Sequence, residues 1–339
     1  MNQESAPRVL DIIGCFATLK VKAHLTRAFI RTAGVCALAT AVACTQAPVA
    51  VDTEAFQNRQ LPAAYGLVLT ALERPARAVP ARYRVIVIPG SGCAGMEPIA
   101  QRYFAGLLHA HVLVLHKPWV DARSRLPSHQ CSAAFVQADA LSAWRDHAIA
   151  ALRADAKNRA GLQVLPQLLV GISEGAELLP TLAPEVPHLA GLVLLSASGL
   201  DPQQALLMQA ELRGVTADLR ALKQAQDSAL PDTAVREGRS LRYWRDMSHW
   251  SLAESLLASP WPLLQVWGGA DALVPQAAYQ RFGAMTHQRT APYCGRSLFN
   301  ADHGLQRAGH DGVQQLWGWL EKWARAPESG LCAAVAAAG

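Results

Sequence analysis

The sequence predicts an α/β fold with a mostly parallel sheet flanked by helices. Short apolar runs rich in β-branched residues alternate with stretches of helical periodicity across residues 63–330, which is typical of strands buried on both faces and covered by helices. Apolar residues make up 51% of the chain and charged residues 17%. This is the composition of a packed globular protein.

Seven runs are expected to form strands, and most of them end at glycine, proline or serine. They are residues 66–72, 84–88, 112–115, 165–170, 190–195, 263–267 and 297–299. The first of them is expected at the edge of the sheet. Residues 138–160 and 313–323 repeat large apolar side chains at helical spacing and predict two helices that cover the sheet.

A long insert over residues 201–257 separates two of the expected core strands. Asp201 followed by Pro202 is a favourable helix start, and apolar residues recur at helical spacing after it. Because strands are expected on both sides of it, we expect the insert to lie outside the sheet as a helical cap. The main domain is therefore residues 63–330, and residues 331–339 read as an alanine-rich tail.

Aromatic and apolar side chains gather at the end of the expected cap, at Tyr243, Trp244, Met247 and Trp250. In a cap they could roof an apolar pocket. The partner would then be a small-molecule substrate with an apolar acyl or aromatic part. The alternative is that these side chains pack the cap against the body.

The first 44 residues have the features of an export signal. Basic residues precede a small and apolar run over residues 32–43, which has the length of a secretory h-region and is too short to span a bilayer. Ala41 and Ala43 suit signal peptidase, and the same end followed by Cys44 resembles a bacterial lipobox. We expect an exported bacterial protein, periplasmic or anchored to the membrane through a lipidated Cys44, with a linker over 45–62. A buried N-terminal helix is the alternative.

Removing those 44 residues leaves 26 basic and 24 acidic residues. The body is nearly neutral and has no basic stripe, which argues against nucleic acid as a partner. Its four cysteines, an even number, permit two disulfides in three pairings. We favour the pairs nearest in sequence, Cys93–Cys131 and Cys294–Cys332, over the other pairings and over four free thiols.

No metal and no cofactor are expected. The cysteines show no CxxC or Cys/His spacing typical of zinc. His109, His111 and His116 cluster around one expected strand, but they lack a third ligand at a clear spacing. A role in the core or on the surface is therefore favoured for them.

Residues 171–175 match the pattern G-x-S-x-G, with Ser173 at the centre. The motif follows a strand-like run and precedes a helix-like one over 176–182, which is the context that a nucleophile elbow requires. Pro180 is expected to kink or shorten the helix-like run. Glycines at 171 and 175 leave room where larger side chains would collide with the adjoining strand and helix. The hypothesis is that Ser173 is a nucleophile, and a chance glycine turn is the alternative.

A serine nucleophile needs a base, an acid behind that base and an oxyanion site. Asp271 and His303 each follow an expected strand, and the order Ser, Asp, His is the one expected for this arrangement. The backbone N–H groups of Ser91 and Glu174 are the candidate oxyanion donors. For the loop at residues 89–92, a plain strand-ending turn is the alternative.

Four segments together resemble the α/β-hydrolase superfamily, from about residue 66 to residue 323: PGSG (89–92), GISEG (171–175), GGADALVP (268–275) and ADHGL (301–305). The resemblance implies Ser173, Asp271 and His303 as a catalytic triad, with backbone donors at Ser91 and Glu174. The chain is distantly similar to dienelactone-hydrolase-like and peptidase-like branches. Many dienelactone-type enzymes carry cysteine at the nucleophile, so the serine favours ester, thioester or amide substrates.

Rival groups and rival functions remain at this point. Asp302 could replace Asp271, and His249 or His310 could replace His303. The expected function is a serine hydrolase, with carboxylic esters favoured. An acyltransferase would use the same residues with another acceptor. A non-catalytic envelope protein could keep the fold as a scaffold, although a scaffold has no need of all three side chains.

Overall fold

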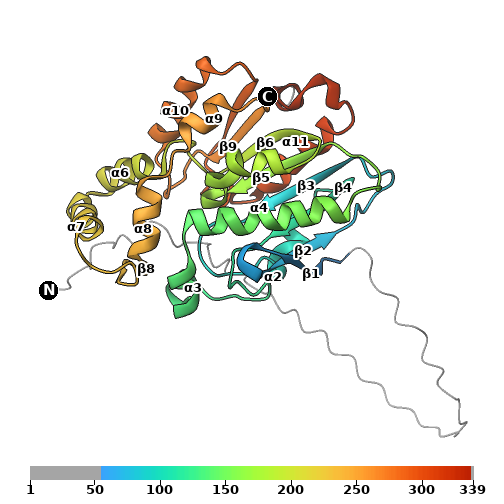
Figure 1. Cartoon of the computed structure of the whole chain (residues 1–339). Helices are drawn as coiled ribbons and strands as arrows, with labels where there is room; N and C mark the ends of the chain where they lie inside the picture. Colours follow the sequence, from blue (N-terminus) through green and yellow to red (C-terminus); the bar gives the residue numbers. More distant parts are fainter. Residues whose placement is uncertain (1–54, 337–339) are drawn as a thin grey trace, which may run out of the picture.

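The computed structural model describes residues 55–336, and an eight-stranded sheet lies at its centre (Figure 1). The strand order is β1 (Gln57–Pro62), β2 (Val68–Arg74), β4 (Ala110–Leu115), β3 (Tyr83–Ile88), β5 (Gln167–Ile172), β6 (Leu189–Leu195), β9 (Leu263–Gly268) and β10 (Tyr293–Leu298). β2 is antiparallel to both of its neighbours, and all other pairs are parallel. The predicted mostly parallel sheet is confirmed.

The edge strand β1 was not predicted. Its sequence QNRQLP is polar and only Leu61 is buried, because an edge strand with one exposed face needs few apolar residues. Two expectations are therefore wrong. The linker expected over 45–62 contains a strand from residue 57 onward, and β2 is the second strand of the sheet rather than its edge. The last strand, β10, also begins four residues earlier than expected.

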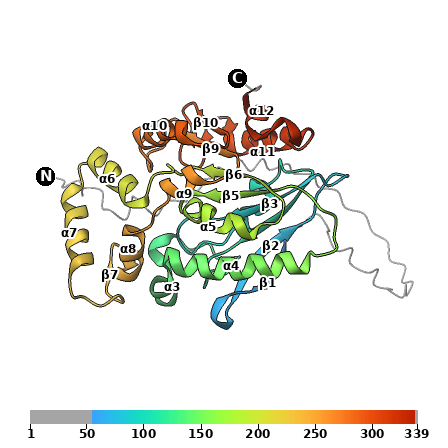
Figure 2. The ribbon, with the colours of Figure 1, turned by 45° about the horizontal axis from the view of Figure 1, so that its top comes forward.

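Alternate residues of the central strands face opposite sides of the sheet and build two cores. On β3, Ile86 and Ile88 belong to one core, while Val85 and Val87 belong to the other. The helix α4 (Leu141–Asn158) covers the first face, with Trp144 buried on it. The helices α11 (Gly312–Trp323) and α12 (Leu331–Ala336) cover the second face (Figure 2). The short helix α2 (Glu97–Tyr103) packs on the same core through Ala100.

The segment expected as one helix over 138–160 is divided. The short helix α3 (Ala133–Ala138) ends before Asp139, and α4 begins at Leu141. Ala140, which directly precedes α4, has extended backbone with φ −159°. The break places Asp139 between the two helices, where it becomes part of a buried cluster described below.

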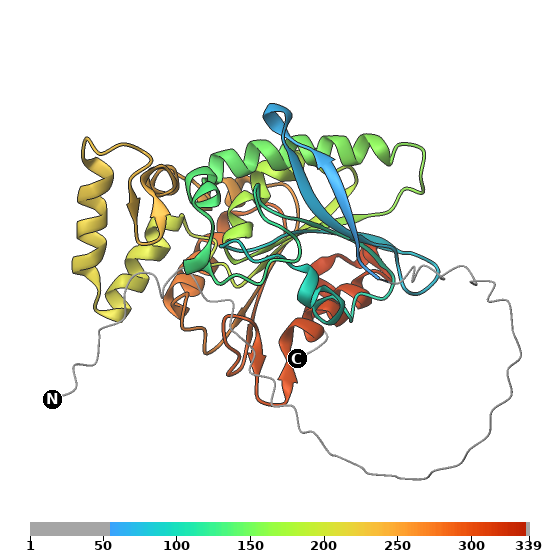
Figure 3. The same cartoon turned by 90° about the horizontal axis from the view of Figure 1, so that it is seen from below.

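The insert between β6 and β9 forms the predicted helical cap. It consists of α6 (Pro202–Arg213), α7 (Thr216–Asp227), the hairpin of β7 (Val235–Arg236) and β8 (Arg239–Ser240), α8 (Leu241–Ser248) and α9 (Ala253–Ala258). Its outer helices α6 and α7 lie to one side of the sheet (Figure 3). The Asp201 carboxylate accepts hydrogen bonds from the N–H groups of Leu252 (2.7 Å) and Ala253 (2.9 Å) and so joins the start and end of the cap.

Both favoured disulfides are present, and each joins cysteines 38 residues apart. Cys294–Cys332 ties β10 to α12, whose Leu331 and Val335 are buried against the sheet. The C-terminal segment up to residue 336 is thus a packed helix, and the alanine-rich tail predicted from residue 331 is wrong there. The expected export signal, Cys44 and the start of the expected linker lie outside the described residues. None of the described helices is long and apolar enough to cross a membrane.

We predict that the double variant Cys294→Ala/Cys332→Ala lowers the free energy of unfolding, measured by urea denaturation. Opening a loop of this length costs about 4 kcal/mol in the chain-entropy account. Because the other disulfide closes an equally long loop, Cys93→Ala/Cys131→Ala is the matched comparison and should lose a similar amount. A midpoint unchanged in both variants would contradict the prediction.

Candidate active site

The elbow at Ser173 is sterically tight. β5 ends at Ile172, and Ser173 has a φ of 51°, a left-handed backbone that costs energy in a residue with a side chain. A Cβ on Gly171 would lie 2.4 Å from Ala176 Cα, and one on Gly175 would lie 2.2 Å from the Ile88 carbonyl oxygen. Glycine at both positions therefore allows the turn to form.

The helix-like run over 176–182, which Pro180 was expected to kink or shorten, is divided. A 3₁₀ helix, η3 (Ser173–Leu178), is followed by the four-residue α5 (Leu179–Leu182). Pro180 lies in the first turn of α5, where its missing N–H leaves no helical hydrogen bond unmade. The elbow therefore leads into tight turns.

The structure brings together the three side chains predicted to act as a triad. Asp271 follows β9 and His303 follows β10. The His303 imidazole lies between the other two groups, with Nε2 3.1 Å from Ser173 Oγ and Nδ1 2.9 Å from Asp271 Oδ2. Because β5, β9 and β10 are parallel strands, their carboxyl ends meet at one edge of the sheet.

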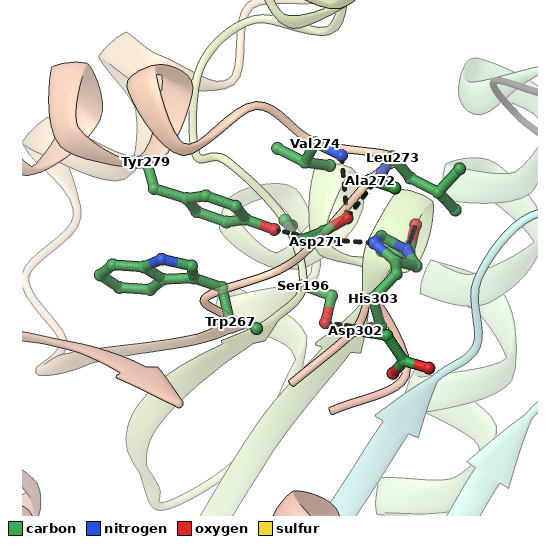
Figure 4. A network of polar contacts seen from close by, with 12 residues as sticks. Ser196, Trp267, Asp271, Ala272, Leu273, Val274, Tyr279, Asp302 and His303 are labelled. Carbon is green, nitrogen blue, oxygen red and sulfur yellow. Dashed lines mark hydrogen bonds and ion pairs between the residues drawn. The ribbon is translucent and has the colours of Figure 1, made fainter. Parts of the chain in front are cut away.

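Asp271 is completely buried and held by several donors (Figure 4). Its Oδ1 accepts from Leu273 N (2.7 Å) and Val274 N (3.0 Å), and its Oδ2 accepts from Tyr279 Oη (2.8 Å). Burial raises the pKa of Asp271. The hydrogen bond from His303, the electrostatic attraction of that imidazole and the hydrogen bonds from Val274 and Tyr279 together outweigh burial and hold the pKa below its usual range.

The ionised Asp271 determines which imidazole nitrogen carries the proton. A carboxylate can only accept hydrogen bonds, so His303 Nδ1–H donates to it. The lone pair of Nε2 then faces the Ser173 hydroxyl, which donates to it. This is the tautomer that a general base for Ser173 requires.

The rival groups are placed elsewhere. The Asp302 carboxylate points away from the imidazole (Figure 4) and accepts from Gln306 N at 2.8 Å. His310 Nε2 lies 2.8 Å from Gln315 Oε1, and His249 is exposed at the end of α8. These partners and positions favour Asp271 and His303.

Two residues that the sequence analysis missed support the triad. Tyr279, on α10 (Gln276–Met285), donates to Asp271 and stacks on Trp267 with ring centroids 4.9 Å apart. Ser196, at the end of β6, donates to the His303 carbonyl oxygen at 2.6 Å. Ser196 has a φ of 55°. The one sequence signal that could have indicated its role is its position directly after a central strand.

The predicted oxyanion donors lie on segments that pack against each other. Ser91 follows β3, and Glu174 is the second residue of η3. A Cβ on Gly175 would lie 2.3 Å from the Pro89 carbonyl oxygen, so the elbow abuts the loop that carries Ser91. The Glu174 side chain has a separate environment, in which it pairs with Lys117 and contacts Tyr243.

The cap residues predicted to line a pocket are mostly packed. Tyr243, Trp244 and Met247 are buried in the core that α4 also joins. Trp244 Nε1 donates to the Arg236 carbonyl oxygen within the cap, and Trp250 Nε1 donates to the Glu177 carbonyl oxygen of the body, both at 2.9 Å. These contacts favour the packing alternative over a role in lining a substrate pocket.

Residues 55–336 contain no group of three or more side chains suited to hold a metal ion. Two of the three clustered histidines, His109 and His116, have other partners. His109 Nδ1 lies 2.7 Å from Glu321 Oε2. His116 Nε2 accepts from Met96 N at 3.0 Å, and burial lowers the pKa of His116 to about 4.

No family model and no curated protein matches the chain in sequence. Among solved structures, a Mycobacterium tuberculosis puromycin-hydrolyzing peptidase matches 82% of this chain with a TM-score of 0.54 and 14% identity. This chain covers only 40% of that peptidase. A hyperthermophilic esterase from Pyrobaculum calidifontis matches 80% of this chain and 86% of its own length, with a TM-score of 0.53 and 18% identity.

The mouse alpha/beta hydrolase domain-containing protein 10 matches over 97% of its own length and 78% of this chain, with a TM-score of 0.50 and 16% identity. The strand order and the antiparallel second strand indicate the same fold as these similar structures do. This chain has the α/β-hydrolase fold. In this fold, an elbow serine after a central strand is the expected position of a nucleophile.

We predict that Gly175→Ala destabilises the α/β-hydrolase fold by about 1–3 kcal/mol or more, because the added methyl group meets two backbone carbonyls that cannot move freely. Gly318 is the matched control, since it lies in α11 with nothing within 4 Å of an added Cβ. Gly318→Ala should raise stability by about 0.5–1 kcal/mol. Thermal unfolding of both variants measures the difference, and equal melting temperatures would refute the steric account.

Proposed function

We propose that this protein is a serine hydrolase that cleaves an ester, thioester or amide bond through an acyl-enzyme on Ser173. The observation that carries the proposal is the position of His303, within hydrogen-bond reach of both Ser173 and the buried Asp271. Nucleophile, base and orienting acid are thus aligned in the order that acyl transfer requires. The proposed substrate is a small molecule, and no cofactor is required.

In the proposed reaction, Ser173 Oγ attacks the substrate carbonyl carbon while its proton passes to His303 Nε2. The carbonyl electron pair moves onto the oxygen, which the N–H groups of Ser91 and Glu174 stabilise. When the tetrahedral intermediate collapses, the bond to the leaving group breaks and Nε2 returns the proton to that group. Water then attacks the acyl-enzyme while its proton passes to Nε2. Collapse of the second tetrahedral intermediate breaks the bond to Ser173 Oγ, Nε2 returns the proton to that oxygen, and the acid is released.

Carboxylic esters are the substrates that we place first. An alcohol leaves a tetrahedral intermediate more readily than an amine does, so the same site hydrolyses an ester with less assistance. The similar solved structures include an esterase and a peptidase by name, which supports a hydrolase without deciding between these bonds. We propose that the substrate has an apolar acyl or aromatic part. The cap side chains predicted to contact that part are packed in the core instead.

We predict that Asp271→Asn lowers turnover of a p-nitrophenyl ester by about 10³–10⁴-fold, because Nδ1 loses the carboxylate that fixes the tautomer. Ser173→Ala should abolish turnover above background. Asp302→Asn is the matched control, since that carboxylate contacts Gln306 instead, and it should stay within about threefold of wild type. Near-normal turnover by Asp271→Asn would remove the proposed acid, and equal turnover by Ser173→Ala would remove the proposed function.

We further propose that the protein is exported and works in the periplasm, free or anchored through a lipidated Cys44. The two disulfides support this location, because such bonds persist in oxidising compartments. Expression of the full chain in bacteria, followed by mass spectrometry of the mature N-terminus, tests it. We expect a first residue at or just after Cys44, and lipidation would make membrane association depend on that cysteine. A cytosolic protein that retains residues 1–44 would contradict export.

A further inference from the structure

Five polar side chains from separate segments meet in a buried cluster beside the nucleophile. We call this cluster the clamp, and it consists of Lys117, Asp139, Glu174, Arg239 and Tyr243. Three of its members belong to the body: one follows β4, one follows α3, and Glu174 is the residue after Ser173. The other two belong to the cap, on β8 and α8. The clamp therefore joins the cap to the elbow.

Cations and carboxylates alternate in the clamp. Lys117 Nζ pairs with Glu174 Oε1 and lies 3.0 Å from Asp139 Oδ1. Arg239 pairs with the other oxygen of Asp139, and its Nη2 lies 3.6 Å from Glu174 Oε2. The Tyr243 hydroxyl donates to the same Glu174 oxygen at 3.3 Å. The two positive and two negative charges balance.

The clamp is almost completely removed from solvent. The Lys117 and Asp139 side chains are each 2% exposed, Arg239 is 7% exposed and Glu174 is 11% exposed. Aromatic faces complete the enclosure: Lys117 Nζ lies 4.5 Å from the Trp144 ring centroid. Because desolvating four charges costs about as much as their pairing returns, such a cluster is weak evidence for stability. The clamp is therefore expected to contribute something other than stability.

We propose that the clamp positions the oxyanion site, with Lys117, Arg239 and Tyr243 acting as positioning residues on Glu174. The proposal rests on the proposed hydrolase function. The Glu174 N–H and the Glu174 side chain share one Cα, so fixing the carboxylate on three partners restricts the backbone that carries the donor. Oxyanion donors must be held in place before charge develops, and small displacements lose most of their effect.

The cap also contacts the loop that follows Asp271. Arg213 Nη2, on α6, donates to the Ala272 carbonyl oxygen at 2.5 Å, and Gln209 of the same helix donates to the Leu273 carbonyl oxygen. Both acceptors belong to the loop that follows Asp271. The cap thus contacts the acid loop through α6 and the elbow through β8 and α8, which is the arrangement of a scaffold for the site.

Other roles fit the clamp less well. A substrate carboxylate would find no free cation there, since Asp139 and Glu174 already compensate Lys117 and Arg239. Burial lowers the pKa of Lys117 to about 8, while the Glu174 carboxylate opposes this effect. The two carboxylates that contact Lys117 Nζ favour its ammonium form, because that is the form that pairs with them. The geometry of the clamp suits a group of residues that fixes the position of Glu174.

The test compares turnover per active site in Glu174→Gln, Arg239→Met and Arg239→Lys with wild type, on a p-nitrophenyl ester. Active-site titration with a fluorophosphonate counts the folded sites. We expect Glu174→Gln and Arg239→Met to lower kcat per titrated site by about 10–100-fold with KM within about threefold, and Arg239→Lys to recover part of the loss.

Asp232→Asn is the control, because it removes an exposed ion pair with Arg245 on the same cap and should leave kcat within twofold. If these variants do not fold, Tyr243→Phe removes one hydroxyl and keeps the ring, with an expected three- to tenfold loss of kcat per site. Normal kcat per site in folded clamp variants would overturn the proposal, even if stability fell. If wild type itself neither reacts with the fluorophosphonate at Ser173 nor hydrolyses esters, the proposed function fails instead.

Discussion

The hydrogen-bonded chain from Ser173 through His303 to Asp271 is the feature on which the rest of the site depends. Parallel strands deliver these residues to one edge of the sheet, although they lie far apart in sequence. Burial works against an ionised Asp271, and the donors around it overcome that effect. The ionised carboxylate in turn fixes the imidazole tautomer, so each part of the arrangement is useful only when the others are present.

Other residues hold the Ser173–His303–Asp271 hydrogen bonds in position. The Tyr279 hydroxyl donates to Asp271, and the Ser196 hydroxyl donates to the carbonyl oxygen of His303. The cap contributes as well, because α6 contacts the acid loop and the clamp contacts Glu174. Sites built on rigid elements with a supporting shell keep catalytic groups within the narrow tolerances that acyl transfer requires. The cap therefore contacts both the loop after Asp271 and the residue after Ser173.

The sequence predicted the features that leave a local pattern. Apolar runs marked the buried strands, and G-x-S-x-G marked the elbow, because sterics restrict both to few residue types. β1 was missed because an edge strand needs little apolar surface, and α12 was missed because its alanines resemble a tail. The clamp joins residues up to 126 positions apart, from Lys117 to Tyr243, and such pairing leaves no periodic trace. Tyr243 was noticed for its ring, whereas its hydroxyl makes the contact with Glu174.

The most direct test of the central claim is a crystal structure of the protein after reaction with a phosphonate ester, which leaves a stable tetrahedral adduct resembling the intermediate. The account predicts a bond from phosphorus to Ser173 Oγ, His303 Nε2 still within hydrogen-bond reach of that oxygen, and the phosphonyl oxygen between the N–H groups of Ser91 and Glu174. An adduct on another residue, or a phosphonyl oxygen directed away from both N–H groups, would contradict it.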